Sequence, residues 1–364
     1  MRVKAMLRSD SAERPTEPPP PAVSAENRTS VVVASIVALV LLAATAVVLT
    51  VQSVRDTDTV RAASGYRGEL DGGSMFRQVA FDPEGTWLYA ATGTTVEVRH
   101  PVTHRRAGAV FEIGSRVLTM VISPDGRRLV TVAEDNSVRV WDTESRQPVG
   151  EPLAAEGLTR AIGLAINPDS TLLAVAGDGG TALWNLADRR VVGLLQAANG
   201  SHSSVAFSPD GSRVATGDTG GGTVVLWSTD TRQPEGEPLV AHQPGASVNA
   251  VAFDRSGTVL ADGSGDFVAN VWNLTAREHT EFRGHEFQPV HSVILTADGR
   301  TMITASLNSM RIWDVQSVAE VGRTYGKDGS DDINDIALSP DGDTLAVIRD
   351  HRIEFWSLDG LRNR

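Results

Sequence analysis

Short apolar runs alternate with polar turns along most of this chain. Residues 117–122 form one such run, residues 129–132 follow after an Asp-Gly turn, and a third run ends at Trp141. Short runs rich in β-branched side chains, joined by Asp-Gly turns, are typical of antiparallel strands and hairpins. The pattern therefore predicts an all-β domain built from meanders.

One turn phrase recurs seven times. Its copies are Asp82-Pro83-Glu84-Gly85, Ser123-Pro124-Asp125-Gly126, Asn167-Pro168-Asp169-Ser170, Ser208-Pro209-Asp210-Gly211, Asp254-Arg255-Ser256-Gly257, Thr296-Ala297-Asp298-Gly299 and Ser339-Pro340-Asp341-Gly342. Their fourth positions are separated by 41, 44, 41, 46, 42 and 43 residues. A unit that recurs every 41 to 46 residues indicates a solenoid or propeller, in which each unit completes its hydrophobic core against its neighbours.

A weaker fourth strand is expected after the third run of each unit. Residues 146–153 and 232–239 are almost identical in sequence, and each segment holds two prolines. Proline cannot donate to a strand ladder, so such a segment fits only the edge of a sheet. Each unit is predicted to be a four-stranded meander with this strand outermost.

A tryptophan closes the third strand of six units. These residues are Trp141, Trp184, Trp227, Trp272, Trp313 and Trp356. Arg99 holds the position in the first unit, which marks that unit as atypical. Seven sheets packed radially bury faces that one sheet alone would leave exposed.

These signatures resemble the WD40 β-propeller family. Trp141-Asp142 and Trp313-Asp314 keep the dipeptide that names the family, and the resemblance covers residues 65–364. It implies a seven-bladed propeller and says little about function, because this fold hosts many roles. Residues 65–72 echo the outer-strand phrase, so we expect them to pair with the strand that ends at Trp356 and to close the ring.

The segment before the propeller predicts a membrane anchor. Residues 31–51 are 21 uncharged, mostly apolar residues, which matches the ~20 needed to cross a bilayer as a helix. We predict a disordered Pro-rich tail over 1–28, a transmembrane helix over 29–54 and a linker over 55–64. A cleavable signal peptide with Ala44-Thr45-Ala46 as its cleavage site is the alternative.

The balance of basic residues around the anchor suggests its orientation. Five basic residues precede the apolar stretch and three follow it closely. Positive residues favour the cytoplasmic side. The expectation is a single-pass plasma membrane protein with its tail in the cytoplasm and its propeller outside.

Composition narrows the range of partners. Six basic and four acidic residues lie in residues 1–55, which leaves 27 basic and 41 acidic residues, a net charge of −14, for the rest. This acidity argues against a nucleic-acid partner. The absence of cysteine excludes disulfides, thiolate metal sites and a cysteine nucleophile. The high ratio of arginine to lysine is typical of GC-rich bacterial genomes.

A His-Ser-Asp-Trp set stands in the fifth unit. The resemblance implies that Asp266 orients His242, which bonds Ser264, which bonds the indole of Trp272. Such a tetrad satisfies buried polar groups between strands. A hydrolase triad is the competing interpretation, but no Gly-x-Ser-x-Gly elbow surrounds the serine.

Four aspartates crowd one loop between the last two units, at positions 328, 331, 332 and 335. Calcium binds several converging oxygens, so this spacing permits a calcium site. Ile333 and Ser339 occupy positions where an EF-hand needs Gly and Glu, which favours an ordinary solvated loop. We expect no metal, cofactor or catalytic residue.

A partner-binding rim is predicted from strand register. One residue per unit, near the start of each first strand, should approach one mouth of the central channel. These residues are Arg77, Leu118, Ile162, Ser203, Asn249, His291 and Asn334. Phe267 and Phe287 lie in loops near the same rim, where aromatic side chains can anchor partners. The alternative is that these residues only complete the packing of the blades.

The predicted function is a membrane-anchored, non-catalytic scaffold that binds or senses proteins. Resemblance to membrane-tethered WD40 proteins of actinobacteria is consistent with it. Two alternatives stay open: a propeller-channel enzyme of the lactonase or quinoprotein type, and a structural protein of envelope assembly.

Overall fold

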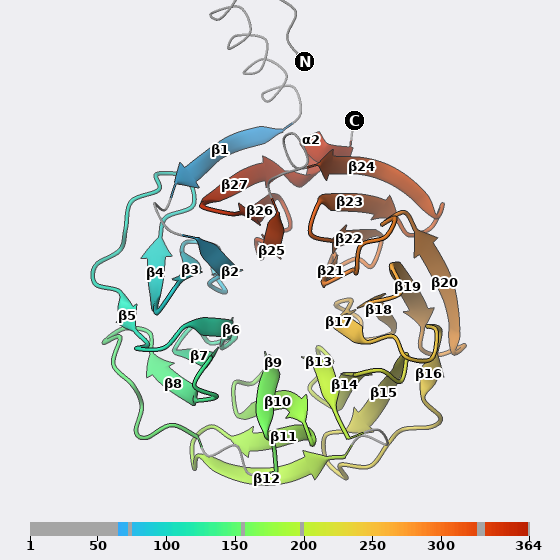
Figure 1. The fold of residues 1–364 in the computed structure, drawn as a ribbon, viewed down its shortest axis with the longest axis horizontal. Helices are drawn as coiled ribbons and strands as arrows, with labels where there is room; N and C mark the ends of the chain where they lie inside the picture. Colours follow the sequence, from blue (N-terminus) through green and yellow to red (C-terminus); the bar gives the residue numbers. More distant parts are fainter. Residues whose placement is uncertain (1–64, 72–74, 154–156, 197–199, 326–331, 363–364) are drawn as a thin grey trace, which may run out of the picture. The chain divides into compact units, whose positions relative to one another are not determined.

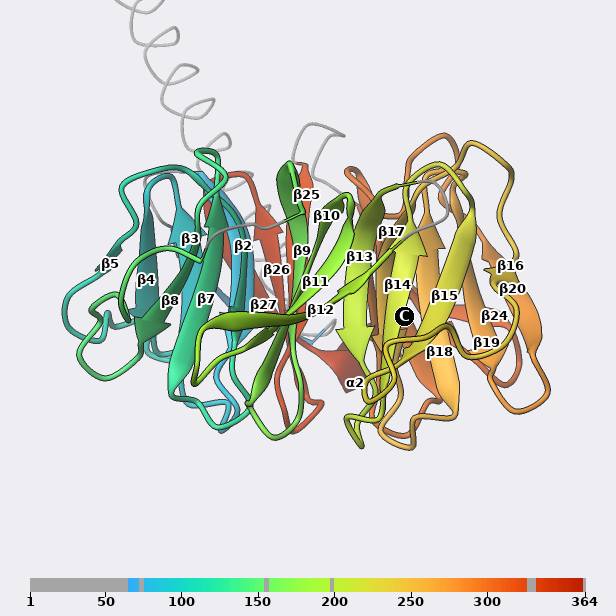
Figure 2. The ribbon, with the colours of Figure 1, turned by 90° about the horizontal axis from the view of Figure 1, so that it is seen from below.

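Seven antiparallel sheets form a closed ring in the computed structural model, which describes residues 65–71, 75–153, 157–196, 200–325 and 332–362. The sheets stand like blades around one axis, with the first strand of each blade innermost (Figure 1). In the side view the strands of neighbouring blades run across the thickness of the ring (Figure 2). The all-β, seven-bladed propeller predicted from the repeats is confirmed.

The first four blades follow one another along the chain. Blade 1 consists of β2 (Phe76–Phe81), β3 (Leu88–Thr92), β4 (Thr95–Arg99) and β5 (Phe111–Glu112). Blade 2 consists of β6 (Val117–Ile122), β7 (Arg128–Ala133) and β8 (Val138–Asp142). Blade 3 consists of β9 (Arg160–Ile166), β10 (Leu172–Asp178), β11 (Gly180–Asn185) and β12 (Arg190–Leu195). Blade 4 consists of β13 (His202–Phe207), β14 (Arg213–Asp218), β15 (Thr223–Ser228) and β16 (Leu239–Val240).

The remaining blades complete the ring. Blade 5 consists of β17 (Val248–Phe253), β18 (Val259–Ser264), β19 (Val268–Asn273) and β20 (Glu278–Arg283). Blade 6 consists of β21 (Ser292–Leu295), β22 (Thr301–Ala305), β23 (Ser309–Asp314) and β24 (Ala319–Tyr325). Blade 7 consists of β25 (Ile333–Leu338), β26 (Thr344–Arg349), β27 (Arg352–Ser357) and the distant β1 (Tyr66–Asp71). A short helix, α2 (Leu358–Arg362), follows β27.

The recurring turn phrase joins the first and second strands of every blade. Its first side chain accepts a hydrogen bond from the backbone N–H five residues later, as Asp82 does from Trp87 (2.9 Å) and Ser123 from Arg128 (2.9 Å). Its fourth residue has a left-handed backbone, with φ of 70° at Gly85 and 62° at Ser170. The phrase therefore needs a short polar side chain first and, with one exception, glycine last.

The hydrophobic core lies between blades. Trp141 of blade 2 packs with Tyr89 and Phe111 of blade 1, and five other blade tryptophans likewise face the preceding blade. Because Arg99 replaces the tryptophan in blade 1, the junction of blades 7 and 1 is filled by Phe76 and Phe355 instead. Burial therefore depends on the neighbouring blade, as in other repeat proteins.

The strand β1 is the outer strand of blade 7. It pairs antiparallel with β27, with Tyr66 opposite Trp356 and Asp71 opposite Arg352. The rings of Tyr66 and Trp356 meet edge to face at 5.1 Å. The sequence analysis placed this strand at residues 65–72. Pairing of the two ends joins segments far apart in sequence and removes an open sheet edge.

The predicted fourth strand of blade 2 does not form, and this expectation was wrong. Residues 146–153 contribute only isolated bridges, one of Pro148 to Trp141 and one of Leu153 to Val138. Blade 2 is a three-stranded sheet among the described residues. The two prolines remove backbone donors, so a continuous ladder cannot be made.

A repeated side-chain latch joins neighbouring blades at their outer edge. Five residues after the tryptophan position, a residue with a left-handed backbone reaches onto the outer segment of the preceding blade. Arg146 donates to the carbonyl of Ala109, Arg189 to that of Glu151, and Arg277 to that of Glu237. His104 takes this place in blade 1 and stacks on Phe355 of blade 7 at 5.3 Å. Sequence reasoning did not identify this latch.

The predicted anchor lies outside the described residues, as do the tail over 1–28 and the linker over 55–64. Within the ranges that the structure describes, no helix has the length and apolar character needed to span a bilayer.

Candidate functional site

A buried polar network in blade 5 replaces the predicted tetrad. His242 Nδ1 lies 3.0 Å from Asp266 Oδ1, as expected. Its Nε2 lies 2.6 Å from Asp262 Oδ1, and the indole of Trp272 donates to Asp262 Oδ2 at 2.6 Å. The structure corrects the role predicted for Ser264, whose hydroxyl instead accepts from the backbone N–H of Asp266 at 3.3 Å.

The residue that bonds the tryptophan lies in the middle of the second strand. In blades 2, 4 and 6 this residue is Thr131, Thr216 or Thr304, at 2.8–3.0 Å from the indole nitrogen. Asp262 is the counterpart in blade 5, with Leu260 opposite Trp272 in the strand pairing. Counting back from the tryptophan by strand register would have found it, since strand side chains alternate between faces.

Opposite pKa shifts distinguish the three buried histidines of these networks. Burial lowers the pKa of His202 and of His285 to about 4. Burial also disfavours the charge on His242, but hydrogen bonds and charge from Asp262 and Asp266 outweigh it, so the pKa of His242 is raised. Histidine and both carboxylates are shielded from solvent, so the network acts on stability and offers no nucleophile to a substrate.

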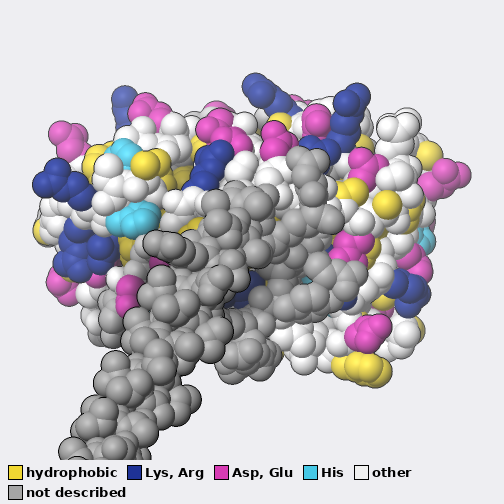
Figure 3. Space-filling view, turned by 90° about the horizontal axis from the view of Figure 1, so that it is seen from above, with side chains coloured by type: hydrophobic (Ala, Val, Ile, Leu, Met, Phe, Trp, Pro, Cys, Tyr) yellow, Lys and Arg dark blue, Asp and Glu magenta, His cyan; other side chains and the backbone are white. Residues whose placement is uncertain are grey.

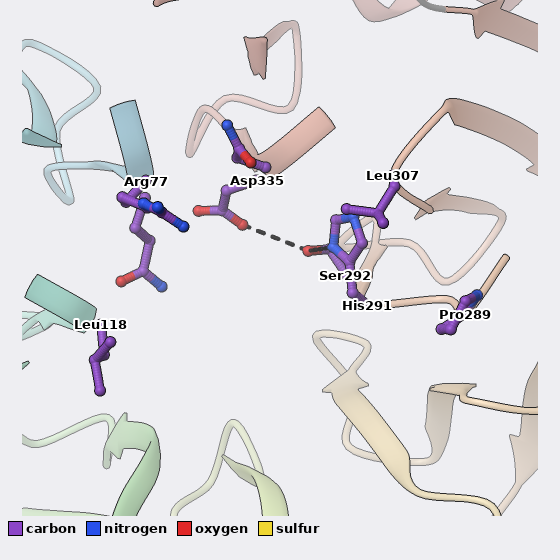
Figure 4. Close-up of a pocket in the computed structure, with 9 residues that line it drawn as sticks. Arg77, Leu118, Pro289, His291, Ser292, Leu307 and Asp335 are labelled. Carbon is purple, nitrogen blue, oxygen red and sulfur yellow. Dashed lines mark hydrogen bonds between the residues drawn. The ribbon is translucent and has the colours of Figure 1, made fainter. Parts of the chain in front are cut away.

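An axial pocket of about 440 Å³ opens at one end of the ring's axis. We define it by its lining residues: Arg77, Gln78, Leu118, Pro289, His291, Ser292, Leu307, Asn334 and Asp335. They come from blades 1, 2, 6 and 7 and from the loop that enters blade 6 (Figure 4). Four of the seven residues predicted to form the rim are among them.

A β-bulge explains why one residue per blade turns toward this end. In six blades the pairing of the first and second strands skips a single residue. The skipped residues are Arg77, Leu118, Ile162, Ser203, Asn249 and Asn334. A bulge re-aims the side chain of the extra residue. His291, the seventh rim residue, directly precedes β21 and donates its backbone N–H to the carbonyl of Ala305 (2.9 Å).

Several rim side chains hold neighbouring blades together. Asn249 Nδ2 donates to the carbonyl of Val290 at 3.1 Å, and Asn334 Nδ2 to that of Phe76 at 3.3 Å. Ser203 Oγ donates to the carbonyl of Val248 at 2.7 Å. Asn249, Asn334 and Ser203 therefore contribute to the packing of neighbouring blades, which was the alternative to a partner-binding role.

A short polar chain lies on the pocket wall. Asp335 Oδ2 accepts from the backbone N–H of Val79 at 3.0 Å, and Oδ1 accepts from Ser292 Oγ at 3.4 Å. Ser292 Oγ also lies 3.0 Å from Nδ1 of His291. Desolvation raises the pKa of Asp335 to about 7 despite these bonds and lowers the pKa of His291.

This chain of groups lacks the geometry of a hydrolase or a metal site. The serine lies between the histidine and the carboxylate, whereas a catalytic triad needs the histidine in the middle. No cluster of three or more metal-ligating side chains occurs among the described residues. Of the four aspartates once considered for calcium, Asp335 is turned into the pocket, Asp332 is exposed, and positions 328 and 331 lie outside the described ranges.

Two exposed aromatic side chains lie in loops at the same end of the blades as the pocket. Phe287, in the loop between β20 and β21, is 84% exposed, and Phe267, in the turn between β18 and β19, is 37% exposed. Their backbones are left-handed, with φ of 60° and 73°. This conformation is rare for a bulky residue, although at Phe267 it belongs to the turn between the second and third strands, where Asn136 of blade 2 also has a φ of 61°. Leu307, 45% exposed, adds an apolar side chain to the lining of the pocket itself.

Charged side chains are mixed on the side of the propeller drawn in Figure 3. Basic and acidic groups alternate there without a continuous basic patch. Ion pairs on the surface of the propeller include Arg67–Asp343 (2.6 Å) and Arg128–Asp142 (2.6 Å). The described residues visible in this view form no continuous basic surface of the kind that binds nucleic acid.

Comparison with known proteins finds four segments of the chain that match a repeat family. The family model described as "WD domain, G-beta repeat" matches residues 110–142, 192–228, 235–273 and 277–314. These four repeats include the third strands that end at Trp141, Trp227, Trp272 and Trp313.

Two plant proteins are similar to part of the chain. The WD repeat-containing protein 26 homolog of Arabidopsis thaliana is 32% identical over 114 residues, which is 30% of this chain and 19% of that protein. THO complex subunit 3 of Arabidopsis thaliana is 32% identical over 114 residues, 28% of this chain and 33% of that protein. The chain thus spans a third or less of the curated relatives it matches.

Proposed function

We propose that this WD40-repeat propeller is a non-catalytic scaffold that binds a protein partner through the face around the axial pocket. The observation that carries the proposal is the pair Phe267 and Phe287, both exposed and both held on left-handed backbones. Aromatic side chains are enriched among the residues that carry most of the binding energy of protein interfaces. WD40 repeats commonly serve as protein-binding surfaces, which supports the same conclusion.

The pocket supplies complementary contacts beside these anchors. Arg77 brings an exposed guanidinium, His291 an imidazole, and Leu118 and Leu307 bring exposed apolar surface. A mixture of apolar anchors and polar edge is the usual anatomy of a protein interface.

Site-specific crosslinking in cells tests this assignment. A photoreactive residue at position 287 of the full chain should give discrete crosslinked products, and Phe267→Ala, Arg77→Ala or His291→Ala should reduce their yield. The matched control is position 102, where Val102 is 79% exposed in the loop after β4, at the opposite end of the blades. Equal crosslinking from both positions would contradict the proposal.

We further propose that residues 31–51 anchor the protein in the plasma membrane, with the propeller outside the cytoplasm. The length and apolar character of this stretch support the anchor, and the flanking basic residues support the orientation. Alkaline extraction should leave the chain in the membrane fraction. Protease added to intact cells should remove a carboxyl-terminal epitope, and protection until lysis would reverse the orientation.

A further inference from the structure

A second cavity lies between blades 1 and 2, at the end of the blades opposite the axial pocket. Its volume is about 510 Å³. It is lined from blade 1 by the turn between β2 and β3, by Tyr89 and by Val98, and from blade 2 by the turns that contain Asp125 and Glu144. We call it the interblade groove.

The hydroxyl of Tyr89 has no structural use in this groove. Tyr89 is only 6% exposed, lines the groove, and its hydroxyl has no hydrogen-bond partner within the described ranges. A buried tyrosine hydroxyl usually has a partner. The charges that act on it are Asp82 and Arg146, both lining the same groove. Because this hydroxyl lines the groove and makes no hydrogen bond to the described residues, it is free to bond a group that enters.

The repeat itself does not need these aromatic residues. The other six blades have Val130, Ala174, Ala215, Ala261, Ile303 and Ala346 at the position of Tyr89. At the position of Trp87 they have Arg128, Leu172, Arg213, Val259, Thr301 and Thr344. No other blade has an aromatic residue at either position, so the Trp87–Tyr89 pair is particular to blade 1.

The charge of the groove is negative. Its lining holds four carboxylates, Asp82, Glu84, Asp125 and Glu144, and one guanidinium, Arg146. That guanidinium is already engaged, because it donates to the carbonyl of Ala109 and lies 5.9 Å above the ring of Phe111. Glu84 and Glu144 are exposed at the rim. A cation that enters would meet carboxylates, a phenol oxygen and an indole face.

We propose that the interblade groove binds a lysine or arginine side chain from an extended segment of a protein partner. An ammonium or guanidinium would donate to the Tyr89 hydroxyl and to the carboxylates, while the indole of Trp87 offers a cation–π contact. An anion is disfavoured by the excess of carboxylates. The site is distinct from the face around the axial pocket, so the two proposals can fail independently.

The test uses the purified full chain in detergent and a labelled Gly-Ser peptide that carries several lysines. Fluorescence anisotropy should show binding that weakens with salt, and a glutamine version of the peptide should not bind. Tyr89→Phe keeps the ring and the packing and should weaken binding about tenfold, because one hydrogen bond to a charged group is lost. Glu84→Gln should weaken it severalfold.

A charge-matched control separates a defined site from diffuse attraction. Glu286→Gln removes an equally exposed carboxylate near Phe287, at the other end of the blades, and should leave the affinity unchanged. The proposal is overturned if the lysine peptide does not bind, if Tyr89→Phe binds as the wild type does, or if Glu286→Gln weakens binding as much as Glu84→Gln. Unchanged melting temperatures of the variants would show that each remains folded.

Discussion

The buried histidines of blades 5 and 6 should respond to pH in opposite directions. In blade 6, His285 Nε2 lies 2.7 Å from Thr304 Oγ1, and Nδ1 lies 3.0 Å from Ser306 Oγ. No carboxylate is among these partners, and burial keeps the imidazole neutral with a pKa of about 4. In blade 5, two carboxylates flank His242 and favour its protonated form.

The size of the stability change caused by His285 follows from the linkage between proton binding and folding. An unfolded imidazole with a pKa of 6.5 takes up a proton as the pH falls, whereas folded His285 with a pKa of about 4 does not. Since the unfolded state then binds more protons, the folded state loses stability below pH 6.5. Between about pH 7.5 and about pH 5 this loss is about 2 kcal/mol.

The assay compares urea unfolding of the wild type and His285→Gln at those two pH values. Glutamine keeps a donor and an acceptor but cannot titrate, so the variant should lose about 2 kcal/mol less on acidification. His202 acts in both proteins and cancels in the difference. His242→Gln should lose more stability than the wild type on acidification. The raised pKa of folded His242 gives stability that is present below pH 6.5 and lost as the pH rises through that folded pKa, and the variant lacks this contribution. If His285→Gln lost as much stability as the wild type on acidification, the proposed lowering of the His285 pKa by burial would be refuted.

Three further predictions concern the fold. Gly217→Ala would place a Cβ 2.5 Å from the carbonyl oxygen of Val248 and should cost about 1–3 kcal/mol of stability in urea denaturation. The control is Gly265→Ala, whose Cβ would meet only contacts of 3.6 Å and more, and it should be near neutral in the same assay. Deleting Tyr66–Asp71 should expose the edge of β27, lower the melting temperature and promote association, and an unchanged melt in calorimetry would contradict closure by β1. Calcium should leave the melting temperature unchanged, because Asp335 is tied to Val79 inside the pocket, and a calcium-dependent rise would revive the metal site.

The repeated pattern carried most of the fold information. The turn phrase depends only on local interactions: its first side chain caps the turn and its fourth residue has a left-handed backbone. It therefore forms the same turn in every blade. The rim positions also followed from strand register, and four of the seven line the axial pocket. By contrast, the pairing of Ser264 with Trp272 was expected from the family pattern and not from register, and Asp262 takes that place.

Other features required knowledge of which blades meet. The latch of Arg189 onto the carbonyl of Glu151 joins residues 38 apart in sequence, and nothing local to either residue marks the contact. Asp335 is part of an aspartate-rich stretch that suggests solvent, yet the bulge at Asn334 directs it to the backbone of Val79, across the junction of blades 7 and 1. The packing of consecutive blades brings the first pair together, and only the closed ring brings the second pair together.

The sequence by itself determined the number of blades, the three inner strands of each blade and the turns between them, because these depend on alternation, spacing and local hydrogen bonds within one unit. The tertiary structure decided which polar groups are buried as partners, where the two cavities lie, and which side chains remain exposed on the faces. These properties arise between units, and their energies depend on desolvation and on distances across blade junctions that no single repeat contains.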